Sequence, residues 1–186
     1  MRLFTLAITL LLIGFNAYSQ GQQKPIMEWV RTWQDGINGQ TIIDDIAVDS
    51  YGESYLICHY ANQFFDVQGT NSIQDYYLGN FDRSGVFRWG LNVSSLGFPR
   101  RVEVLNDTSL YVIGQDEIVK YDMSGNLVNS SSIPSAWLME DFDFDSEGNV
   151  YCIGRSLGGN PVQFGDTTIG GLGLLLLKFD SNLNPV

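Results

Sequence analysis

The protein has 186 residues, of which 21 are acidic and 10 are basic, so its formal net charge is −11 at pH 7. This charge repels nucleic acid and anionic membrane surfaces, and we therefore expect no nucleic-acid partner. Glycine and aromatic residues are abundant and no amphipathic helix is evident after residue 20, which favours an all-β fold.

The first 19 residues have the pattern of a secretory signal peptide. Arg2 supplies a short positive region, residues 3–15 are almost entirely apolar, and Ala17 and Ser19 place small side chains at the −3 and −1 positions of a cleavage site. The apolar run is too short for a comfortable membrane span, although an uncleaved membrane anchor is the alternative interpretation. We therefore predict a signal peptide over residues 1–19, and a secreted or cell-surface protein with no membrane insertion after cleavage.

Three segments of the remaining chain repeat one pattern over thirteen positions without a gap. They are residues 46–58, 102–114 and 142–154. Each has alternating apolar residues, a polar turn and a second alternating run, which is typical of a β-hairpin with one buried face. Two of the matching columns are the tyrosines Tyr55, Tyr111 and Tyr151 and the isoleucines Ile57, Ile113 and Ile153.

A second signature follows each hairpin: a strand that ends in an aromatic residue and Asp, and then a turn. It occurs at residues 77–85, 118–125 and 175–183. Together with a further strand, such as VFRW at 86–89, it gives units of four short antiparallel strands. The connection between the second and third strands is long in the first and third units and nearly absent in the second, where it is Gln115-Asp116.

Four-stranded units of this length are typical of β-propeller blades. We therefore predict an all-β fold, a partial β-propeller of about three four-stranded antiparallel blades, with the third incomplete. A β-sandwich also uses many short strands, but it does not need repeats that match column by column. The predicted domain boundaries are a short linker at 20–27 and a partial propeller at 28–186, which contains a closing-type strand at 28–33, blade 1 at 41–90, blade 2 at 99–133 and blade 3 at 137–186.

A family is recognisable from these residues. The run DDIAVDSYGESYL at 44–56, the aromatic-Asp-x-x-Gly turn and the closing Trp89 resemble the SBBP ("seven-bladed β-propeller") repeat family of exported bacterial proteins. Residues 163–169 and 174–180 are similar to the segment that the family has between its second and third strands. The resemblance covers most of residues 29–186. It implies a large cell-surface or secreted protein, and the family has no general catalytic motif to carry over.

Three blades are fewer than the four to eight or so that closed propellers usually have. We therefore expect the N-terminal part of a larger protein, or a chain that closes with copies of itself or with a partner. The remaining blades or another copy are needed to complete the ring. An open stack exposes a sheet face and strand edges, and we expect Phe142 and Phe144 to lack a following blade that covers their surroundings.

The turn of the third repeat also has features of a calcium loop. Asp143, Asp145 and Glu147 alternate before Gly148, as oxygen ligands do around the sharp turn of such a loop. The distal acid is missing, because Gly154 stands eleven positions after Asp143, and the aligned copies lack the motif. A β-hairpin explains all three copies. The three acids are therefore weak calcium candidates, and we predict no other metal or cofactor site.

No catalytic constellation emerges from the sequence. His59 is the only histidine, and it directly follows Cys58, so the two side chains of this strand would point to opposite faces. Cys58 and Cys152 fall on equivalent strands of different units, which favours separate thiols over the disulfide that an exported pair could form. The acid pairs Asp44-Asp45 and Glu140-Asp141 begin the first strand of a unit and are expected to be solvated strand ends rather than catalytic pairs.

The long loops carry aromatic residues that would suit ligand recognition or, equally, would seal the outer end of a blade. These candidates are Tyr60, Phe64, Phe65, Tyr76 and Phe164. We expect an exported, non-enzymatic propeller segment that acts as a binding or scaffold module for a protein or carbohydrate ligand. The alternatives are the N-terminal part of a propeller enzyme that acts on extracellular polymers, with its catalytic residues beyond residue 186, and a calcium-stabilised surface adhesin element.

Overall fold

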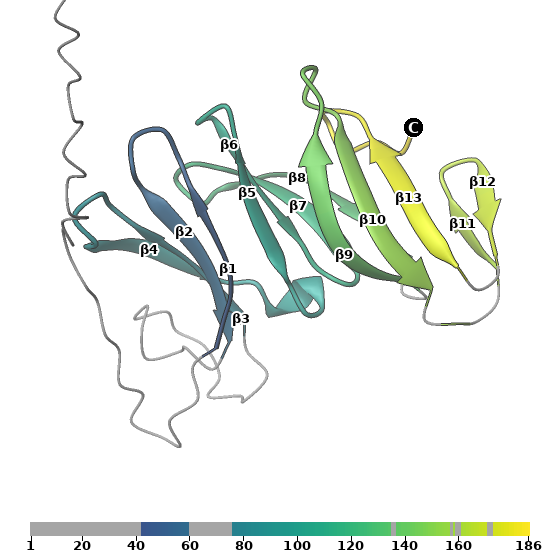
Figure 1. Ribbon diagram of the computed structural model, residues 1–186, viewed down its shortest axis with the longest axis horizontal. Coiled ribbons are helices and arrows are strands. Elements are labelled where there is room, and N and C mark those ends of the chain that lie inside the picture. Colours follow the sequence, from purple (N-terminus) through teal and green to yellow (C-terminus); the bar gives the residue numbers. More distant parts are fainter. Residues whose placement is uncertain (1–41, 60–75, 135–136, 157, 159–160, 171–172) are drawn as a thin grey trace, which may run out of the picture.

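The computed structural model describes residues 42–59, 76–134, 137–156, 158, 161–170 and 173–186. The predicted signal peptide, linker and closing-type strand lie outside the described residues. The described chain consists of three antiparallel β-sheets and a small hairpin. The sheets stand next to one another as successive blades, so the fold is a partial β-propeller, as predicted (Figure 1).

The first two blades each have four strands in sequential order. The strands of blade 1 are β1 (Ile42–Val48), β2 (Ser54–His59), β3 (Tyr76–Phe81) and β4 (Phe87–Asn92). A short 3-10 helix, η1 (Ser94–Leu96), leads into blade 2. The strands of blade 2 are β5 (Arg101–Leu105), β6 (Ser109–Ile113), β7 (Glu117–Asp122) and β8 (Leu127–Ser132).

The third blade has three strands in the spatial order β13-β10-β9. These strands are β9 (Trp137–Phe144), β10 (Val150–Ser156) and β13 (Leu174–Phe179). A hairpin of β11 (Val162–Phe164) and β12 (Thr167–Ile169) occupies the long connection between β10 and β13. Beyond β13, a single antiparallel bridge joins Phe179 to Pro185. The prediction of an incomplete third blade is confirmed.

Successive blades pack through one repeated arrangement of faces. We call the face of a blade that is turned toward the next blade its forward face, and the opposite face its rear face. On the forward face of blade 1, Tyr55 and Ile57 pack into a cluster with Val102 and Val112 on the rear face of blade 2. The same columns repeat at the next interface, because strand residues two apart share a face. That cluster contains Tyr111 and Ile113 of blade 2 and Phe142, Cys152 and Leu177 of blade 3.

The expectation for Phe142 and Phe144 is wrong. Phe142 is 5% exposed, and both rings belong to the core between blades 2 and 3, where Phe144 contacts Tyr111 edge-on with 4.8 Å between ring centroids. They lie on the rear face of blade 3, which blade 2 already covers. The uncovered apolar side chains are those of the forward face, Ile153, Leu174 and Leu176.

Five aspartates build the turns between strands in the same way. In each turn, the Oδ1 atom accepts hydrogen bonds from the backbone N–H groups two and four residues later, as Asp145 does from Glu147 and Asn149. The five are Asp49, Asp82, Asp122, Asp145 and Asp180. The third residue after the Asp has a positive φ, which explains the glycine of the Asp-x-x-Gly signature; in the last turn Leu183 takes this conformation.

Blade 2 lacks this aspartate in its first turn, where Leu105 replaces it. The tyrosine hydroxyl that would bond to the aspartate is therefore in a different environment in this blade. The hydroxyl of Tyr55 donates to Asp49 over 3.2 Å, and that of Tyr151 donates to Asp145 over 3.2 Å. The equivalent Tyr111 is fully buried, and its hydroxyl has no hydrogen-bond partner among the described residues. A buried polar group without a partner costs about 1–3 kcal/mol.

We therefore expect Tyr111→Phe to raise the free energy of unfolding by about 1 kcal/mol, because it removes a buried hydroxyl that no described residue bonds. Tyr55→Phe is the matched control: it removes a hydroxyl that donates to Asp49 and should lower the same quantity by about 1 kcal/mol. Urea denaturation of both variants measures the difference. Equal losses of stability in the two variants would contradict this account.

Candidate ligand pocket where three blades meet

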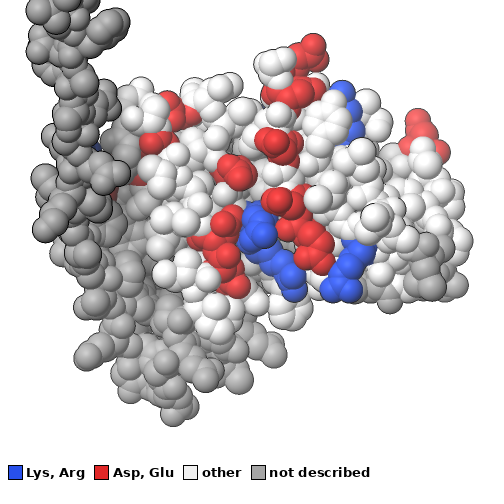
Figure 2. Space-filling view, viewed as in Figure 1, with Lys and Arg blue, Asp and Glu red and all other residues white. Residues whose placement is uncertain are grey.

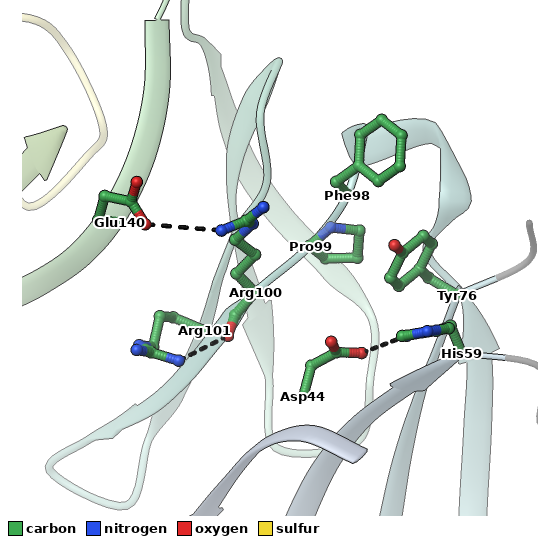
Figure 3. Close-up of a pocket in the computed structure, with 8 residues that line it drawn as sticks. All are labelled: Asp44, His59, Tyr76, Phe98, Pro99, Arg100, Arg101 and Glu140. Carbon is green, nitrogen blue, oxygen red and sulfur yellow. Dashed lines mark hydrogen bonds and ion pairs between the residues drawn. The ribbon is translucent and has the colours of Figure 1, made fainter. Parts of the chain in front are cut away.

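A pocket of about 350 Å³ lies where the first strands of the blades converge (Figure 3). Strand β1 contacts β5, and β5 contacts β9, so residues far apart in the sequence come together here. The pocket is lined by Asp44, His59, Tyr76, Phe98, Pro99, Arg100, Arg101 and Glu140. In blade 1 they come from strands β1, β2 and β3. The others come from the connection into blade 2, from β5 and from β9. No single blade could form this site.

One side of the pocket is aromatic. The rings of His59 and Tyr76 lie 5.0 Å apart between centroids, and the ring of Phe98 contacts Tyr76 edge-on at 6.0 Å. Phe98 is 56% exposed and has a φ of +49°, a left-handed conformation that is uncommon for a large side chain. The local structure therefore presents an aromatic ring to solvent at some conformational cost.

The connection between blades 1 and 2 holds Phe98 in this position. Gly97 also has a positive φ of +60°, and a Cβ atom there would collide with the carboxylate of Asp116. The backbone N–H of Asp116 donates to the carbonyl of Leu96 over 3.1 Å, and the N–H of Gln115 donates to the carbonyl of Gly97. The short turn between β6 and β7 thus clamps the two residues that precede Phe98.

The other side of the pocket is charged and largely paired. Arg100 forms an ion pair with Glu140 over 3.5 Å, and Glu140 also accepts a hydrogen bond from Arg155 over 2.8 Å. On the aromatic side, Asp44 Oδ2 lies 2.7 Å from His59 Nδ1. The sequence predicts that the acid pairs are solvated strand ends. The structure shows that they also form ion pairs and hydrogen bonds. They hold basic side chains of neighbouring strands and blades in place.

Further acids surround the pocket on the first strands of the blades. Asp45 accepts a hydrogen bond from the backbone N–H of Val102 over 2.9 Å and so links blades 1 and 2. Figure 2 shows acidic side chains gathered over this part of the molecule, with basic side chains among them. Partial desolvation raises the pKa of Glu103, and the negative charges of Asp45, Asp141 and Asp143 raise it further.

The structure tests the position of two of the five candidate loop aromatics. Tyr76 lines the pocket at the start of β3. Phe164 is half-buried and contacts Phe179 edge-on with 5.3 Å between centroids, so it seals the outer part of blade 3. Tyr60, Phe64 and Phe65 lie outside the described residues. Their role stays a prediction.

The calcium candidates lie in the turn between β9 and β10, and the hairpin interpretation of this stretch is confirmed. Both oxygens of Asp145 accept hydrogen bonds from the protein: Oδ1 from two backbone N–H groups and Oδ2 from the side chains of Asn149 and Tyr151. Asp143 Oδ1 accepts the N–H of Phe144. Within the described ranges, no three His, Cys, Asp or Glu side chains are grouped as a metal site would require. A calcium site at Asp143, Asp145 and Glu147 stays a prediction.

The two cysteines are separate and buried thiols, as the repeat register indicated. Burial raises the pKa of both Cys58 and Cys152 to about 12, so neither is a ready nucleophile at neutral pH. The Cys58 thiol faces the carbonyl of Tyr77 at 3.9 Å, whereas His59 pairs with Asp44. Cys58 stands where the other blades have Gly114 and Gly154, at which a Cβ would collide with the carbonyls of Leu96 and Leu138.

Sequence reasoning missed most of the pocket. Phe98, Pro99 and Arg100 lie in the connection between two blades. The predicted boundaries leave Phe98 between blades and count Pro99 and Arg100 as the start of blade 2. The one available signal was an aromatic residue between Gly97 and Pro99, two residue types that often shape an exposed turn. Nothing in the sequence placed Glu140 beside that turn.

Comparisons with known proteins find similar solved structures and no matching family. No protein-family model and no curated protein matches this chain. Several solved structures are similar to it over part of their length. One is a protein of unknown function from Bacteroides caccae, with 12% identity and a TM-score of 0.47 over 78% of this chain and 44% of that one.

Two further similar structures are YCF48 bound to D1 peptide and BamB from Moraxella catarrhalis. YCF48 has 11% identity and a TM-score of 0.46 over 77% of this chain and 39% of its own. BamB has 13% identity and a TM-score of 0.39 over 75% of this chain and 47% of its own. The present chain thus spans less than half the length of each of the three. Among the described residues, no helix is long and apolar enough to cross a membrane.

The raised pKa of Glu103 predicts a pH-dependent effect of one substitution. Because this carboxyl binds its proton more tightly in the folded state than in the unfolded state, its contribution to stability is greatest below its ordinary pKa of 4.5 and is lost as the pH rises through the folded-state pKa. We expect Glu103→Gln to raise the Tm at pH 7 and to have little effect below about pH 4. Thermal unfolding at several pH values measures this.

Asp122→Ala provides a control of opposite sign. Hydrogen bonds from Asn126, first from its side chain and then from its backbone, lower the pKa of Asp122 below its ordinary 3.8. Its contribution to stability is therefore present above that value and is lost as the pH falls. The variant should have a lower Tm at pH 7, and the difference should shrink in acid. A pH-independent Glu103→Gln effect would contradict the electrostatic explanation.

Proposed function

We propose that this chain is an exported, non-enzymatic binding and scaffold module that forms the opening blades of a longer β-propeller protein. One observation carries the proposal: the forward face of blade 3 is built like the two forward faces before it, but nothing among the described residues covers it. The protein's function is then to present binding surfaces on a rigid ring of blades.

The equivalent isoleucines make the comparison direct. Ile57 is 0% exposed beneath blade 2, Ile113 is 1% exposed beneath blade 3, and Ile153 is 50% exposed. Leu176, which is paired with Ile153 across β10 and β13, is 66% exposed. Contiguous apolar surface of this kind is uncommon on soluble proteins unless something binds there. Its repeat position supports a further blade as the occupant.

A link that fastens blade 2 to blade 1 has a counterpart on blade 3. Asp45 is the β1 residue that pairs with Ile57, and it accepts the first-strand N–H of Val102. Asp141 is the β9 residue that pairs with Ile153, so it has the equivalent place on blade 3. Its Oδ1 accepts the N–H of Phe142 and pairs with Arg101 of blade 2 over 3.3 Å, which leaves Oδ2 to accept the corresponding N–H group of a following blade.

A second copy of the chain is the less suitable occupant. The rear face of blade 1 would have to cover blade 3 of the other copy. Much of that rear face is already buried, since Leu56, Cys58, Tyr77 and Phe81 are at most 9% exposed. Among the described side chains of that face, the large apolar ones that remain exposed, Ile43, Ile46 and Val48, all lie on the single edge strand β1. A contact between copies would therefore be confined to that strand.

The non-enzymatic part of the proposal rests on the chemistry of the described side chains. Hydrolytic covalent catalysis needs a nucleophile beside a general base. Both thiols are buried and have raised pKa values, and His59 Nδ1 pairs with Asp44 rather than with Cys58. The two thiols therefore give no support to catalysis by a cysteine nucleophile, and the proposal takes the chain as a binding module.

A matched pair of substitutions tests the open face. In the 186-residue protein, Ile113→Ala should lower the free energy of unfolding by about 2–5 kcal/mol, because it leaves a cavity between blades 2 and 3. Ile153→Ala should cost less than about 0.5 kcal/mol, because its side chain is already half-exposed. In the protein as its source organism produces it, both substitutions should lower the free energy of unfolding by similar amounts. A small effect of Ile153→Ala there would contradict a covering blade.

The intact mass of the native secreted product decides where the covering blade comes from. We expect a mass clearly above that of the mature chain, which would agree with further blades in the same polypeptide. A mass equal to the mature chain together with a monomeric size in solution would overturn the proposal. A matching mass with a dimeric size would assign the open face to a second copy instead, and would also contradict it.

Export has its own test. When the protein is produced with its natural N-terminus in a bacterial host, we expect the product outside the cytoplasm to begin at Gln20, because the signal peptidase selects small side chains such as Ala17 and Ser19. N-terminal sequencing measures this. Ser19→Arg is the control, and it should accumulate the uncleaved precursor. A product that retains residues 1–19 would identify an anchor rather than a signal peptide.

A further inference from the structure

We infer that the pocket between the three blades binds a neutral saccharide. The sugar stacks on Phe98 and forms hydrogen bonds with the charged side of the pocket. This inference rests on the proposed binding role and gives it a ligand class. It does not depend on any further blade, because every residue named for the pocket belongs to blades 1 to 3 or to the connection between them.

The aromatic side suits the apolar face of a sugar ring. Sugar rings present C–H groups on one face, and these pack well against exposed aromatic rings. Phe98 supplies such a ring beside the cavity, with Tyr76 edge-on behind it at 6.0 Å. The left-handed backbone of Phe98 is held by bonds from the turn between β6 and β7, so the ring is presented on a fixed support rather than on a free loop. Fixing a binding group in advance lowers the entropic cost of binding.

The polar side suits the hydroxyl groups of the same ring. Hydroxyls both donate and accept, and planar side chains with two donors or two acceptors can bind neighbouring hydroxyls together. Arg100 provides donors, and its side chain is 45% exposed, while Glu140 provides acceptors and is 39% exposed. Asp44, at 23% exposed, adds a carboxylate on the aromatic side. The Arg100–Glu140 distance of 3.5 Å is long for an ion pair, so both groups retain capacity for a ligand.

The charge balance argues against other small ligands. The pocket lining contains two arginines and two carboxylates, so it is close to neutral when His59 is neutral. An anionic ligand would also meet Glu103, Asp141 and a protein of net charge −11. A peptide would need a strand edge or a long groove for its backbone groups, whereas this lining offers separate side chains around about 350 Å³. A neutral ligand rich in hydroxyls fits these constraints best.

A panel of defined oligosaccharides tests the inference on the purified secreted protein. The probes are the hexamers of β-1,4-glucan, α-1,4-glucan, β-1,3-glucan, β-1,4-xylan and chitin, with oligogalacturonate as the acidic comparison and a random peptide library as the protein arm. Saturation-transfer NMR detects binding, and calorimetry gives the affinity. We expect at least one neutral oligosaccharide to bind, and oligogalacturonate to bind more weakly or not at all.

Variants then place the binding in the pocket. Phe98→Ala should weaken binding by roughly fivefold to tenfold, and Arg100→Gln by about tenfold or more, while Phe98→Tyr keeps a ring and should restore most of the affinity. The matched control is Leu127→Ala, since Leu127 is a similarly exposed apolar side chain on the outer strand β8. An unchanged Tm excludes unfolding as the cause of a loss.

Three results would overturn the inference: no binding of any neutral oligosaccharide at millimolar concentration, tighter binding of oligogalacturonate or of a peptide, or neutral-sugar binding that Phe98→Ala and Arg100→Gln leave unchanged. None of these affects the intact mass or the comparison of Ile113→Ala with Ile153→Ala. Failure of the saccharide inference is therefore distinguishable from failure of the proposed scaffold.

Discussion

The structure depends on the burial of each blade's forward face by the rear face of the next blade. A sheet with apolar side chains on both faces is not stable alone in water, and here two successive contacts bury the Tyr55–Ile57 and Tyr111–Ile113 columns almost completely. The same requirement leaves the forward face of blade 3 unsatisfied. Stability, assembly and the position of the pocket all follow from this one-dimensional stacking, in which a blade contacts only its neighbours.

The repeated four-stranded blades could be predicted from the sequence because the interactions that form them are local. Alternating apolar residues give strands with two faces, and the Asp-x-x-Gly turns fix the connections by bonds within five residues. The four-stranded blades, the missing long loop of blade 2 and the incomplete third blade were all predicted on this basis. The alternation does not show which face of a blade is turned toward the next one. That is why Phe142 was expected to be uncovered although blade 2 buries it.

The pocket could not be predicted, because its residues meet only after the blades have stacked. Asp44, Phe98 and Glu140 come from three separate parts of the chain, and none of them belongs to a motif with fixed spacing. The sequence marked Tyr76 as a candidate from its type and its place beside a loop. It gave no means of pairing Arg100 with Glu140, since that contact depends on how β5 lies beside β9.

The exceptional second blade links the fold to the candidate site. Because blade 2 lacks a long loop between β6 and β7, the turn at Gln115 and Asp116 lies close enough to hold the carbonyls of Leu96 and Gly97. Asp116 also accepts, through its backbone carbonyl, the N–H of Ile133 over 2.8 Å, which ties the same turn to the end of β8. The short turn of blade 2 thereby holds the connection that presents Phe98. The departure from the repeat completes the aromatic side of the pocket, to which blade 1 contributes His59 and Tyr76.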